Sequence, residues 1–181
     1  MKRWLAAVAA AAALGTTAWV APAAADSGPY CGIRWGSLTK EAGTLSPAHL
    51  TNVRAGRHAC YDRLVLDLDG RAPGYLVGYV AQVTQDASGA VVPLRGGAKL
   101  QIVARAPAYD AAGRPTYRPA NRAELVNVAG FSTFRQVAWA GTFEGQTTIG
   151  LGVRARLPFR VFTLSGPGTG SRLVIDVAHY W

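Results

Sequence analysis

The chain beyond its first 25 residues is predicted to form an all-β fold, either a sandwich or a barrel. It consists of short runs in which apolar and polar residues alternate, the pattern of a half-buried strand. Glycine and proline, of which the whole chain has 21 and 10, separate these runs and supply turn residues. No segment carries a convincing helical period of 3.6 residues. This combination is typical of a β-sandwich or barrel.

The first 25 residues are predicted to be a secretory signal peptide. Met1-Lys2-Arg3 is followed by an apolar, alanine-rich segment over 4–20 and by the small residues Ala23-Ala24-Ala25. The apolar segment is shorter than the roughly 20 residues of a membrane span, so we favour cleavage over the alternative of an uncleaved anchor. We therefore expect a secreted, extracytoplasmic protein with no stable membrane insertion.

The candidate strands follow one another with turn residues between them. The run 107–122 contains three turn-forming residues and no period, so it is either a solvated connector or a basic, aromatic lip. Helical turns have room only at 46–50 and 122–125. The expected strands are 50–55, 62–68, 75–83, 98–104, 125–128, 131–139, 147–154, 159–164 and 171–177.

Two of these strands carry the same motif, an arginine and an aspartate four positions apart around a valine. The motif residues are Arg63, Val65 and Asp67 in the first and Arg172, Val174 and Asp176 in the second. Because strand side chains alternate, these residues share one face and aliphatic residues fill the other. We expect the aliphatic faces to form the two halves of one core and the charged faces to point outward on opposite sheets.

The charged faces have two interpretations. An arginine fork matches carboxylates or phosphates, and an aspartate accepts hydrogen bonds from hydroxyls or amides, so the six motif residues are candidate ligand-binding residues. The alternative is an ion pair on an exposed sheet, which contributes only about 0–1 kcal/mol.

Cys31 and Cys60 are predicted to form a disulfide, because an exported chain with an even number of cysteines is expected to be oxidised. Neither belongs to a Cys-x-x-Cys motif or accompanies clustered histidines, so we expect no metal site and no cofactor. Trp35, four residues after Cys31, is expected to cover one end of the core.

The formal net charge is +9, and it falls to +7 when Lys2 and Arg3 are removed. A basic exported protein attracts anionic wall polymers, lipid head groups or acidic glycans. The chain beyond the signal peptide has no run of adjacent basic residues, so nucleic acid is not an expected partner.

The sequence offers little support for catalysis. His58, beside Asp62, and His179 are the candidate bases, but there is no Gly-x-Ser-x-Gly or His-Glu-x-x-His motif. Asp67 and Asp69 lack the further oxygen ligands of a calcium loop, so an Asp-Gly turn explains them better. The aromatic side chains of the strands are expected in the core or in cross-strand pairs rather than stacked on sugars.

The chain resembles the AMIN-like family of exported actinobacterial proteins. The resemblance lies in residues 56–67, which contain the first motif, and in 158–164 followed by the second motif. The turn-rich residues 26–43 are expected to be an ordered lead-in that contains no strand. The resemblance implies a small β-sandwich of two similar sheets over 44–181. It also implies a non-catalytic module that contacts peptidoglycan. The chain departs from that pattern in the 107–122 insertion and the cysteine pair, and it carries no appended catalytic domain.

Peptidoglycan or another anionic wall polymer is therefore the expected partner. The alternative is a protein–protein module that recruits or regulates a cell-wall enzyme.

Overall fold

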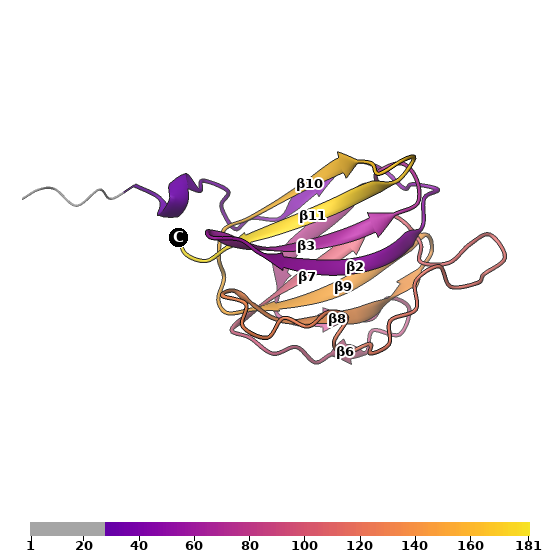
Figure 1. Ribbon diagram of the computed structural model, residues 1–181. Helices are drawn as coiled ribbons and strands as arrows, with labels where there is room; N and C mark the ends of the chain where they lie inside the picture. Colours follow the sequence, from indigo (N-terminus) through magenta and orange to yellow (C-terminus); the bar gives the residue numbers. More distant parts are fainter. Residues whose placement is uncertain (1–27) are drawn as a thin grey trace, which may run out of the picture.

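The structure is a computed structural model of the chain, and it describes residues 28–181. The predicted signal peptide lies outside these residues. The described part is a β-sandwich of two antiparallel sheets with a small third sheet, which confirms the all-β fold (Figure 1). Within 28–181, no helix has the length and apolarity needed to cross a bilayer.

Sheet A contains five strands and sheet B contains four. Sheet A has the order β1 (Lys40–Ala42), β4 (Tyr75–Val80), β7 (Ala98–Ala104), β9 (Gln146–Val153) and β8 (Phe134–Phe143). Sheet B has the order β10 (Phe159–Ser165), β11 (Ser171–Ala178), β3 (Tyr61–Leu68) and β2 (Leu50–Arg57). The third sheet is the short hairpin of β5 (Val83–Thr84) and β6 (Val91–Val92), and a 3-10 turn, η1 (Tyr30–Gly32), precedes β1.

The core lies between sheets A and B. Sheet B contributes the aliphatic faces of β3 and β11, including Leu64, Leu66 and Ile175, which are fully buried. Sheet A contributes Ile102 and Leu151, among others, from its inner face. Alternation therefore predicted correctly which side of each motif strand faces the core.

The two motif strands lie side by side in one sheet, so the expectation that they occupy opposite sheets is wrong. β3 and β11 pair antiparallel in the middle of sheet B (Figure 1). Their aliphatic faces together form one half of the core, and sheet A forms the other. Alternation contains no information about which strand is the neighbour of which, and this is why the assignment failed.

The outer face of sheet A is partly covered by the segment that contains β5 and β6. Val83 and Leu94 of this segment pack over Gly150 of β9, where a Cβ atom would lie 2.7 Å from the Leu94 side chain. A Cβ on Gly152 would lie 2.0 Å from the carbonyl oxygen of Arg95. Glycine in β9 therefore permits this close approach, and the two sheets differ in how much of their outer surface remains open.

Two local predictions were wrong, and neither segment that left room for a helical turn contains one. Residues 40–42 of the lead-in form strand β1 and pair with β4. Residues 125–128 do not form a strand. The backbone N–H of Leu125 donates to the carbonyl oxygen of Val137 in β8 at 2.8 Å, and Val128 is buried although its backbone pairs with no strand. The segments 46–50 and 122–125 contain no helical turn.

Candidate functional site

The outer face of sheet B carries all six predicted motif residues. The antiparallel register places Arg63 opposite Asp176, Val65 opposite Val174 and Asp67 opposite Arg172. The two motifs thus form three cross-strand rows, with a charged row on each side of the valine pair. Because the register puts the two valines opposite each other, the symmetric motif brings each arginine opposite the other strand's aspartate.

Asp176 is the centre of the first row. Its side chain is fully buried, and its carboxylate accepts hydrogen bonds from Nε and Nη2 of Arg63 at 2.6 and 2.9 Å. Arg160 of β10 approaches from the other side, with Nε at 2.9 Å and Nη2 at 2.8 Å. One buried carboxylate therefore fixes two arginines, and the cluster of three groups keeps one net positive charge.

The hydrogen bond to Asp176 is the main cause that raises the pKa of the Arg63 guanidinium, while partial burial acts against it. Arg63 and Arg160 expose 23% and 40% of their side chains. Both guanidinium groups therefore reach solvent, whereas the carboxylate does not.

The row at the other side of the valines is assembled differently. Asp67 accepts hydrogen bonds from Nε and Nη2 of Arg54 on β2, at 2.8 and 3.0 Å, and from Asn52 at 3.3 Å. The hydrogen bonding to Asp67 is the main cause that raises the pKa of the Arg54 guanidinium. Arg172, its partner in register, donates instead to the carbonyl oxygens of Ser165 and Gly166, both at 3.1 Å. The two motifs therefore do not form equivalent ion pairs.

Val65 and Val174 form the floor between the rows. They expose only 5% and 1% of their surface, although they point away from the core. The valines therefore add almost nothing to the exposed surface of this face, which comes from the polar side chains of the two charged rows and from the rings around them.

Aromatic rings surround the Arg63 and Arg160 guanidinium groups. Arg160 lies 4.5 Å from the centroid of Trp35, 5.0 Å from Phe162 and 5.6 Å from Tyr61. Arg63 lies 5.3 Å from Tyr61 and 5.5 Å from Phe162. These distances are within the range of cation–π contact. We call these five residues the arginine–aromatic cluster.

The lead-in places Trp35 in this cluster. The Cys31–Cys60 disulfide is present and ties the lead-in to the residue directly before β3. Phe159 of β10 donates its backbone N–H to Gly36 at 2.9 Å, and Trp35 packs edge-on against Tyr61 with the ring centroids 5.5 Å apart. Trp35 thus extends the outer face of sheet B and does not cover an end of the core as predicted.

Sequence reasoning did not select Arg160, Phe162 or Tyr61 as site residues. The signal was present in the alternation of β10, because Arg160 and Phe162 are two residues apart and must share a face. Their face became identifiable only once β10 was known to neighbour β11.

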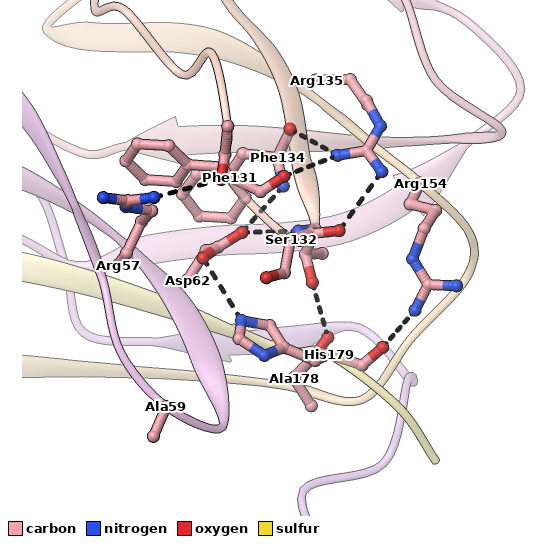
Figure 2. A network of polar contacts seen from close by, with 12 residues as sticks. Arg57, Ala59, Asp62, Phe131, Ser132, Phe134, Arg135, Arg154, Ala178 and His179 are labelled. Atoms are coloured by element: carbon pink, nitrogen blue, oxygen red, sulfur yellow. Dashed lines mark hydrogen bonds and ion pairs between the residues drawn. The ribbon is translucent and has the colours of Figure 1, made fainter.

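A second polar network is buried at the end of the sandwich where β3 begins and β11 ends. Asp62 accepts hydrogen bonds from the backbone N–H groups of Thr133 and Phe134, at 2.6 and 3.0 Å, and lies 3.3 Å from Nε2 of His179 (Figure 2). Asp62 and Thr133 are fully buried, and His179 is 6% exposed. This network joins the two sheets and holds the loop before β8.

The histidine that meets Asp62 is thus His179, whereas His58 stacks on Tyr61 with the ring centroids 4.5 Å apart. The Thr133 hydroxyl donates to the carbonyl oxygen of Ala178 at 3.1 Å. Arg135 donates to the carbonyl oxygens of Phe131 and Ser132 in this loop and of Phe134, the first residue of β8 (Figure 2). The bonds of this network therefore stabilise the loop. Among residues 28–181, no group of three or more acidic, histidine or cysteine side chains is arranged to hold a metal ion.

Comparison with known protein families identifies the family of this chain. The model of the AMIN-like domain family matches residues 48–179, from the residues just before β2 to the end of β11. No curated protein and no solved structure matches the chain. The matched range includes both motif strands and most of the arginine–aromatic cluster. The chain therefore belongs to the AMIN-like family.

Proposed function

We propose that this protein is a secreted, non-catalytic module of the cell envelope that binds peptidoglycan or an associated anionic wall polymer through the outer face of sheet B. AMIN-like domains are cell-wall-related and generally non-catalytic binding modules. The disulfide is consistent with a location outside the cytoplasm.

The observation that carries the proposal is the arginine–aromatic cluster. Asp176 holds Arg63 and Arg160 in place, so a ligand meets donors whose orientation is already fixed. The rings offer flat apolar surface beside them, which suits the C–H faces of sugars, while guanidinium groups suit carboxylates and hydroxyl oxygens. An ion pair that served stability alone would need neither the second arginine nor the rings.

Co-sedimentation with purified peptidoglycan tests the proposal. Phe162→Leu removes a ring from the cluster, and we expect it to reduce the bound fraction several-fold, since stacked rings contribute about 0.5–1.5 kcal/mol. Phe143→Leu is the matched control, because Phe143 is 47% exposed at the far end of β8 in sheet A.

Arg160→Gln supplies a second test, because Asp176 keeps Arg63 as its partner and the fold keeps a paired carboxylate. We expect weaker binding of this variant at low and at moderate salt. Equal binding by the parent, Phe162→Leu and Arg160→Gln would exclude the face as the site. Binding to a wall enzyme but not to bare glycan would support the recruiting module instead.

A further inference from the structure

A second surface, distinct from the arginine–aromatic cluster, has the charge of an anion site. A cleft of about 350 Å³ lies between the end of β4, the start of β7 and the residues after β9. Lys99 and Arg156 line it together with Tyr79, and none of its described lining residues is acidic. Lys99 belongs to the outer face of sheet A, because its neighbour Leu100 is fully buried in the core.

Neither cation of the cleft is neutralised by a carboxylate. Arg156 donates to the hydroxyl and carbonyl oxygens of Ser37, at 3.3 and 3.1 Å, and lies 5.0 Å from the centroid of the Tyr79 ring. These contacts orient the guanidinium group and leave its charge intact. The ammonium group of the Lys99 side chain has no hydrogen bond or ion pair with any residue that the structure describes.

The surroundings of the cleft reinforce its charge. Arg57 and Arg154 belong to the same end of the sandwich, at the ends of β2 and β9, and bind carbonyl oxygens rather than carboxylates. The carboxylates of Asp62 and Asp176 at this end are fully buried. The exposed carboxylates of Glu41 and Asp69 lie toward the opposite end, and Glu124, at the same end as the cleft, is paired with Arg95 at 2.5 Å. The summed field therefore attracts anions to the end that holds the cleft.

We propose that this cleft binds phosphate groups of an anionic polymer. A phosphate offers several acceptor oxygens in a tetrahedron, so it can meet the Lys99 ammonium and the Arg156 fork at the same time. A polymer is favoured over a single small anion because Arg154 and Arg57 add two further cations at the same end of the sandwich. This site is independent of the ligand that the outer face of sheet B binds.

Lys99→Glu is the test variant, and Arg71→Glu is its control. Lys99 makes no bond that the fold would lose, and Arg71 is an exposed arginine beyond the end of β3, at the opposite end of the sandwich. Both substitutions change the net charge equally. Binding to inorganic polyphosphate is measured by fluorescence anisotropy at several salt concentrations, with poly-glutamate as a carboxylate probe and phosphatidylglycerol vesicles as a lipid source of phosphate.

The parent is expected to bind polyphosphate more tightly than poly-glutamate, with an affinity that falls as salt rises. Lys99→Glu is expected to weaken polyphosphate binding about tenfold, and Arg71→Glu less than about twofold, because charge acts mainly over short distances at moderate salt. The double variant Lys99→Gln/Arg156→Gln should lose binding and also flatten the salt dependence.

Equal losses in Lys99→Glu and Arg71→Glu would show a net-charge effect and overturn the site. Binding to the phosphatidylglycerol vesicles without binding to polyphosphate would overturn the proposal that the ligand is a polymer. Loss of peptidoglycan binding in Phe162→Leu with polyphosphate binding intact would confirm that the two surfaces are separate.

Discussion

Asp176 and Asp67 occupy the same position of the same motif, and the structure predicts very different consequences for their substitution. Asp176→Asn keeps the shape of the side chain but removes its charge and places an NH2 group against two guanidinium groups. The Asp176 carboxylate is fully buried and accepts from both arginines, whereas Asp67 is 23% exposed and its partner Arg54 is 51% exposed.

The loss for Asp176→Asn is expected to be about 3 kcal/mol. Breaking a buried ion pair costs roughly 3–5 kcal/mol, and the partial exposure of both arginines favours the lower end of that range. A domain of this size loses about 2–4 °C in Tm per kcal/mol, so Tm should fall by roughly 6–12 °C. Asp67→Asn should cost no more than about 1 kcal/mol, as for an exposed pair.

Thermal and urea unfolding followed by circular dichroism give both values. Arg160→Gln serves as a further comparison, because it removes a cation and leaves one arginine on the buried carboxylate. The reasoning is refuted if Asp176→Asn and Asp67→Asn lower Tm by the same amount, since burial would then not distinguish the two aspartates.

Three other predictions follow from the fold. Reduction of the disulfide, which closes a loop with a sequence separation of 29, should lower the unfolding free energy by about 3–4 kcal/mol, measured by urea unfolding with and without reductant. Gly152→Ala should destabilise the protein by about 1–3 kcal/mol, because the added methyl group would meet the Arg95 carbonyl oxygen. Gly56→Ala on β2 is the control and should cost little, because the structure has space for its methyl group. Equal Tm values of the two variants would contradict this reasoning. Burial raises the pKa of Asp69, but the hydrogen bonds from His49 outweigh it, so the net effect is a lowered pKa. Asp69→Asn should therefore cost a measurable amount of stability at pH 7, below about 1 kcal/mol. This cost should vanish as the pH falls below about 3.9, the pKa of the unfolded state, and through the lowered pKa of the folded state.

The sign of this pH dependence follows from linkage. A carboxylate whose pKa is lower in the folded state binds fewer protons there than in the unfolded state at intermediate pH. Its contribution is complete above the unfolded pKa and disappears once both states are protonated. Unfolding curves of the parent and Asp69→Asn whose separation does not shrink as the pH falls below about 3.9 would contradict this assignment.

Local features of the sequence determined the parts of the fold that depend on neighbours along the chain. Alternation over 62–68 and 171–177 was sufficient to assign Leu64 and Ile175 to the core, because a strand has a period of two in any sheet. Two cysteines in a chain with a predicted export signal were sufficient to predict the disulfide. The apolar run at 125–128 misled for the same reason, since burial of apolar side chains does not require a ladder.

Tertiary structure alone decided which strands are neighbours and hence what the charged residues do. The sequence of the two motifs is compatible with one sheet or with two. Only the pairing of β3 with β11 joins Arg63 to Asp176, and only the position of β10 adds Arg160 to the same carboxylate. The physical reason is that strand alternation specifies a face, whereas a binding surface requires the side chains of several strands, and their order depends on long-range contacts that no local pattern encodes.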